Sequence, residues 1–123
     1  FLTESLRAYR SSDLFNYGPR ETAIKLAQLR MKCSKLNAHL LALHVIESAA
    51  CSCGHNCEDT NHYLLHCPLY ITERDTLLAK LQPLNVSAIT DEVLTKGDSS
   101  LSTSDNKFLF DCIFEFIRNT DRL

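Results

Sequence analysis

Seven of the eleven cysteine and histidine residues in this chain lie in one short window, between positions 51 and 67. Cysteines that are bunched together with histidines are typical of a metal site. Disulfide bonds stabilise a chain most when they close long loops, and a window of this size offers only short ones. The sequence therefore predicts a metal centre with reduced thiols. A secreted domain held by disulfides is the alternative, and thiol titration separates the two.

Two pairs of side chains in this window suit a structural zinc ion, which takes four thiolate or imidazole ligands in a tetrahedron. Cys51 and Cys53 form the first pair. Gly54 follows them, and because it has no Cβ it lets backbone N–H groups approach the thiolates. His62 and Cys67 form the second pair on one predicted helix. We therefore predict that these four residues bind structural Zn²⁺.

Other residues of the window compete for two of the four positions. Cys57 is an alternative to Cys51 at a workable spacing, and His66 is an alternative to Cys67. Glu58 lies in the same window, where a catalytic zinc would use a glutamate as a base. Four good ligands already close the site, so we predict no catalytic residue in this chain.

The rest of the chain predicts an all-α fold: a small bundle of about five to six helices with the zinc knuckle as an insertion. Apolar residues recur at helical spacing along most of the sequence. We expect one domain with a helical N-terminal part containing a helix-turn-helix-like segment (1–50), the knuckle (51–67) and C-terminal helices (68–123). Helices are expected at about 1–15, 20–31, 34–41, 60–67, 68–82, 86–96 and 104–119. Ser34 is a predicted N-cap for the third, and Asp59 or Thr60 for the fourth.

The predicted helix at 104–119 is apolar on nearly all sides. Such a helix either lies at the centre of a domain or docks on another protein. We expect the first arrangement, because a domain of 123 residues has room for one fully surrounded helix. The alternative is a protein-interaction module, stapled by zinc, that docks through this helix.

Charge is distributed unevenly along the chain. The net charge is −2, but residues 1–50 carry +3 and residues 51–123 carry −5. Lys25, Lys32 and Lys35 are expected on one stripe in the basic half, where they would meet nucleic-acid phosphates. No run of about 18 apolar residues predicts a membrane span. No leader sequence follows Phe1, and we expect the chain to be a piece of a longer protein.

The order of residues across the cluster resembles one known family. The positions that carry the resemblance are Cys33-Ser34-x-Leu36-Asn37-x-His39-Leu40, Cys51-x-Cys53-Gly54, Glu58-Asp59, His62-Tyr63-Leu64-Leu65-x-Cys67-Pro68-x-Tyr70 and Glu73-Arg74. They are similar to the zinc-binding C-terminal region that follows the polymerase domain in non-LTR (LINE-type, jockey-like) retrotransposon reverse transcriptases. Many members have Cys-x-x-Cys where this chain has Cys-x-Cys.

This resemblance implies a non-catalytic tail of an RNA-directed DNA polymerase whose active site lies upstream. The tail would assist binding of template RNA or target DNA during reverse transcription. Its partners would be RNA or DNA and the upstream polymerase domain, in a cytoplasmic ribonucleoprotein and in the nucleus. The residues expected to contact nucleic acid by charge or stacking are Lys25, Lys32, Lys35, Tyr63, Tyr70 and Arg74.

Overall fold

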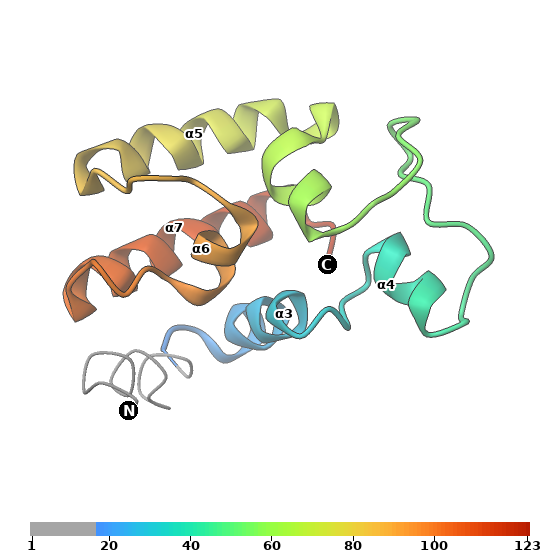
Figure 1. Cartoon of the computed structure of the whole chain (residues 1–123), viewed down its shortest axis with the longest axis horizontal. Coiled ribbons are helices and arrows are strands. Elements are labelled where there is room, and N and C mark those ends of the chain that lie inside the picture. The colour runs from blue at the N-terminus through green and yellow to red at the C-terminus, as the bar shows by residue number, and fades with distance from the viewer. Residues whose placement is uncertain (1–16) are drawn as a thin grey trace.

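The structure is a computed structural model that describes residues 17–123, and within that range every regular element is helical (Figure 1). This confirms the predicted all-α class. The helix expected at 1–15 lies outside the described residues. The elements are α3 (Arg20–Arg30), α4 (Asn37–Ala42), the π-helix η1 (His62–His66), the 3₁₀ helix η2 (Pro68–Tyr70), α5 (Ile71–Leu81), the 3₁₀ helix η3 (Gln82–Leu84), α6 (Asp91–Lys96) and α7 (Thr103–Thr120).

Helix α7 is the centre of the domain, with α3, α5 and α6 packed around it (Figure 1). It begins at the N-cap Ser102, whose hydroxyl accepts a hydrogen bond from the Asp105 N–H. Its buried apolar side chains are Leu109, Phe110, Cys112, Ile113, Phe114, Phe116 and Ile117. Only Phe108 among its large apolar residues is exposed. The helix is therefore part of the core, as expected from its apolar sequence.

The predicted basic stripe does not form, because α3 ends at Arg30 and a turn follows. Lys25 lies on α3, whereas Lys32 and Lys35 lie in the 31–36 connection to α4. Lys32 itself has a positive φ of 58°, which no helix continues through. The three lysines therefore do not share a helix face. No helix within residues 17–123 is both long and apolar enough to span a membrane.

Ser34 does not cap α4 as expected. Its hydroxyl accepts a hydrogen bond from the Leu36 N–H (3.1 Å) and contacts the buried His39 at Nδ1 (2.7 Å). Helix α4 begins three residues after Ser34, at Asn37, and its N-cap Leu36 has no side-chain cap. Ser34 thus links the 31–36 turn to His39 of α4 by hydrogen bonding.

Gly18 lies just before α3, and its surroundings predict that substitution lowers the stability of the domain. Its φ is +95°, and an added Cβ would overlap the Phe114 ring of α7. We expect Gly18→Ala to lower the free energy of unfolding by about 2 kcal/mol, from backbone strain and overpacking together. Gly54→Ala, with both variants compared in the presence of a chelator so that the metal site does not contribute, is the matched control, because its φ is +102° with nothing within 4 Å of the added Cβ. Denaturant titrations that gave equal losses would contradict this expectation.

Candidate metal centre

The four residues predicted as ligands are the ones that the structure brings together. One ligand atom from each of Cys51, Cys53, His62 and Cys67 lies within 4.8 Å of all the others. The Sγ atoms of Cys51 and Cys67 are 3.7 Å apart, and Cys53 Sγ is 3.3 Å from His62 Nε2. Zinc–sulfur and zinc–nitrogen bonds of about 2.3 and 2.0 Å place tetrahedral ligand atoms about 3.5–3.8 Å apart. The cluster therefore has the size and the donor set of a metal site.

The His62–Cys67 half of the cluster depends on a wide helical turn. Asp59 caps this turn, since its Oδ1 accepts a hydrogen bond from the His62 N–H (2.8 Å). Residues five apart on an α-helix point about 140° away from one another. Here the Cys67 N–H donates to the His62 carbonyl oxygen over 2.7 Å, an i→i+5 bond that narrows this offset. Cys67 follows the helix directly instead of lying on it, which corrects the predicted helix at 60–67.

The Cys51–Cys53 half of the cluster depends on a tight backbone turn. The Cys51 N–H donates to the His55 carbonyl (2.8 Å), and the Gly54 N–H donates to the Cys51 carbonyl (3.0 Å). Gly54 supplies the positive φ that this turn requires. The His55 N–H points at Cys53 Sγ from 3.5 Å. A backbone dipole in that position stabilises a thiolate, as expected from the glycine after the first pair.

The two alternative ligands are not part of the cluster. His66 is exposed at the end of η1. Cys57 lies in a separate loop contact, where its N–H donates to His55 Nδ1 over 3.2 Å. The His55 ring in turn stacks on the His62 ring, with centroids 4.3 Å apart and planes inclined by 12°. His55 therefore packs against the candidate ligand His62. The sequence spacing of His55 did not indicate this contact.

At neutral pH the protonation state of His62 favours metal binding, whereas that of Cys67 opposes it. Burial lowers the pKa of His62, so its imidazole is neutral and offers a nitrogen lone pair. Burial raises the pKa of Cys67 to about 12, so this thiol must release a proton when it binds a metal.

Metal affinity is accordingly expected to rise with pH. Each thiol proton displaced by the metal adds about tenfold to the apparent affinity per pH unit, as long as that thiol is protonated in the free protein. Because Cys67 is protonated throughout this range, competition with a chromophoric chelator should give at least tenfold tighter zinc binding at pH 7.5 than at pH 6.5. Equal affinities at the two pH values would exclude Cys67 as a thiolate ligand.

A buried ion pair lies directly behind Cys51. The Glu58 side chain is 3% exposed, and Arg122 contacts it twice, Nε to Oε2 at 2.8 Å and Nη2 to Oε1 at 2.5 Å. The Asn37 N–H also donates to Glu58 Oε1 (2.8 Å), and Cys51 Sγ lies 3.8 Å from Oε2. Arg122 further donates to the Lys35 carbonyl oxygen (3.1 Å). Both oxygens of the Glu58 carboxylate thus have hydrogen-bond partners. Through them the carboxylate connects Arg122, near the C-terminus, to Cys51 of the metal cluster.

Tyr63 and Arg74 are expected from the sequence to contact nucleic acid, and their burial shows that this expectation is wrong. Tyr63 is fully buried and Arg74 is 7% exposed, so neither lies where a nucleic-acid strand can reach it. Arg74 instead donates from Nε to the Leu64 carbonyl (2.9 Å) and from Nη2 to the Tyr63 carbonyl (3.2 Å). The Tyr63 hydroxyl is hydrogen-bonded to Thr120 (2.7 Å). Both side chains join the second ligand pair to the core.

The other residues expected to contact nucleic acid are accessible to different degrees. Tyr70 is half-buried and packs edge-on against Tyr63, with ring centroids 5.5 Å apart. Lys25 pairs with Glu21 at 3.3 Å on α3. Lys32 and Lys35 are exposed in the 31–36 turn. Since the Lys35 carbonyl accepts from Arg122, this turn lies beside the metal cluster.

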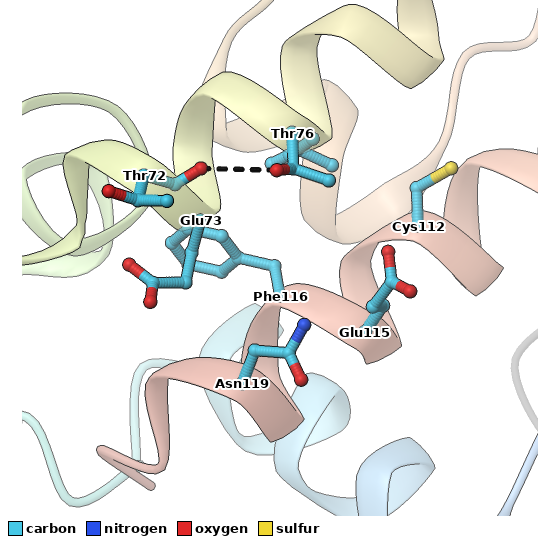
Figure 2. A pocket seen from close by; sticks show the side chains of 8 residues that line it. Thr72, Glu73, Thr76, Cys112, Glu115, Phe116 and Asn119 are labelled. Atoms are coloured by element: carbon cyan, nitrogen blue, oxygen red, sulfur yellow. Dashed lines mark hydrogen bonds between the residues drawn. The ribbon is translucent and has the colours of Figure 1, made fainter.

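A concavity of about 310 Å³ lies between α5 and α7, and none of the four clustered residues lines it (Figure 2). It is lined by Thr72, Glu73, Thr76, Leu77, Cys112, Glu115, Phe116 and Asn119. Burial raises the pKa of Cys112, so its thiol stays protonated near neutral pH. Glu115 is engaged by Lys80. Among these eight residues no activated nucleophile is present, and the metal cluster is the stronger candidate site.

Comparison of the chain with family models, with curated proteins and with solved structures found no match. Its function is therefore inferred from the cluster and from the motifs around it.

Proposed function

We propose that this domain is a structural zinc module, and that it forms the non-catalytic tail of a retrotransposon RNA-directed DNA polymerase. The observation that carries the zinc assignment is the convergence of Cys51, Cys53, His62 and Cys67 within 4.8 Å. Three thiolates and one imidazole select a soft, tetrahedral ion and close the site to substrate. When bound, zinc supplies a cross-link between the 51–57 loop and η1. Elemental analysis of the purified protein should find one zinc ion per chain. Purified protein without zinc would exclude the proposal.

The polymerase-tail assignment rests on the motif resemblance, which spans both ligand pairs. Its expected nucleic-acid role falls to Lys32 and Lys35, because these lysines are exposed in a turn next to the cluster. Phosphate contacts of this kind position a strand without reading its sequence. In this proposal the domain steadies template RNA or target DNA beside the upstream polymerase domain, inside a cytoplasmic ribonucleoprotein and in the nucleus.

The nucleic-acid role predicts a salt-dependent loss of binding in one double variant. Lys32→Ala with Lys35→Ala removes two phosphate contacts, so the slope of log affinity against log salt should fall by about 1.4 for a single strand. Lys80→Ala with Lys96→Ala removes the same charge from α5 and α6 and is the control. Fluorescence anisotropy with single-stranded RNA and DNA measures both. Absence of binding by the wild-type protein, or equal losses in the two double variants, would contradict the assignment.

A further inference from the structure

The cluster contains three thiols within reach of one another, and they differ in exposure. Cys51 and Cys67 are 5% and 0% exposed, with Sγ atoms 3.7 Å apart. Cys53 is only half-buried, and its Sγ lies within 4.8 Å of both. A disulfide needs a sulfur separation of about 2.05 Å, so the reduced Cys51 and Cys67 sulfurs are in van der Waals contact and must approach further to form a bond.

We propose that these three thiols form a modification site for hydrogen peroxide, and that the product is a Cys51–Cys67 disulfide. The inference rests on the proposed function in one respect: the disulfide and the metal compete for the same two sulfur atoms. It assigns Cys53 the first reaction with the oxidant and the two buried cysteines the final bond.

The chemistry balances without a further reactant. The Cys53 thiolate attacks one peroxide oxygen, the O–O bond breaks, and the hydroxide that leaves takes up a proton to form water. Cys53 is then a sulfenic acid. The Cys67 thiol attacks the Cys53 sulfur and passes its proton to the departing hydroxide, which leaves as the second water. Cys51 next attacks Cys67 and expels the Cys53 thiolate, by ordinary exchange. In sum, two thiols are oxidised and one peroxide is reduced to two waters.

Geometry disfavours two competing products, and the Cys53–Cys67 bond is the intermediate that the neighbouring Cys51 resolves from 3.7 Å away. A Cys51–Cys53 bond would span a single intervening residue, which strains the disulfide dihedral angle. Cys57 lies outside the cluster, where its backbone is held by His55. The Cys51–Cys67 bond instead joins the same two segments that the metal joins. Oxidation would therefore release the metal while keeping the 51–67 loop closed, with Cys53 and His62 set free.

Peroxide titration of the purified protein tests the inference. Metal content is measured first, peroxide is added, free thiols are alkylated, and a non-reducing digest is analysed by mass spectrometry. We expect one dominant cross-link between the peptides of Cys51 and Cys67, with one metal ion released per disulfide and recovered binding after dithiothreitol. Cys57→Ser should leave the cross-link unchanged, whereas Cys51→Ser should remove it.

Two outcomes would overturn the inference: a dominant Cys53–Cys57 cross-link, or conversion of Cys53 to sulfinic acid with no disulfide. The zinc proposal fails separately. A purified protein that holds no metal, yet forms the Cys51–Cys67 cross-link, would refute the zinc assignment and support the peroxide site. A zinc-loaded protein that forms no Cys51–Cys67 cross-link would support the zinc assignment and refute the peroxide site.

Discussion

Replacing Cys53 with serine is expected to abolish tight metal binding and to lower the free energy of unfolding by about 3 kcal/mol or more. Structural zinc in small domains contributes apparent binding free energies of about 10–16 kcal/mol, and a closed site needs all four ligands. Residues 43–59 contain turns and bends but no helix or strand. A bound metal would therefore be the main cross-link between the 51–57 turn and the buried residues of η1.

Cys57→Ser is the matched control for this experiment. Cys57 lies in the same loop, is also half-buried, and is outside the cluster. Denaturant unfolding with and without a chelator should show that wild-type and Cys57→Ser proteins lose stability on chelation, whereas Cys53→Ser is already low and does not respond. Chelator-insensitive unfolding of the wild-type protein would contradict a structural metal. Equal behaviour of the two variants would contradict the ligand assignment.

The convergence of Cys51, Cys53, His62 and Cys67 could be predicted from the sequence because metal coordination imposes residue types and short spacings. Both ligand pairs are local, and each depends on a nearby signal: Gly54 for the first turn and Asp59 for the cap of η1. The apolar residues of α7 predicted its central position for a similar reason, since a helix surrounded by neighbours must be apolar on all sides. Local patterns thus gave the fold class and the candidate site.

Features that depend on tertiary contacts could not be predicted in the same way. Arg74 and Tyr63 resemble a basic and an aromatic contact for nucleic acid, yet their partners are backbone carbonyls and Thr120, and burial decides their role. The Glu58–Arg122 pair joins residues 64 positions apart, and no spacing rule connects them. Charged residues are rarely fully buried, so composition favoured a surface position for Glu58.

That ion pair carries the second large prediction: Arg122→Met is expected to lower the free energy of unfolding by about 3 kcal/mol. Removing one partner of a buried pair leaves the other charge without compensation, and Glu58 is the more deeply buried of the two. Arg118→Met is the control, because Arg118 is exposed on α7 and should cost less than about 0.5 kcal/mol. Adding Glu58→Gln to Arg122→Met should restore part of the loss, since a neutral amide costs less to bury.

The pH dependence identifies the charge as the cause. Burial raises the pKa of Glu58, but hydrogen bonds from Arg122 and the Asn37 N–H outweigh this and hold the pKa below its ordinary value of 4.5. The stability that Glu58 contributes is therefore complete above pH 4.5 and declines as the pH falls through the lower pKa of the folded state. In Arg122→Met, only the Asn37 N–H and the Cys51 thiol still oppose the effect of burial, so the pKa of Glu58 should rise and protonation should relieve the buried charge. The stability difference between the two proteins should consequently narrow as the pH is lowered toward 4. A constant difference across this range would mean that Arg122 acts through packing alone.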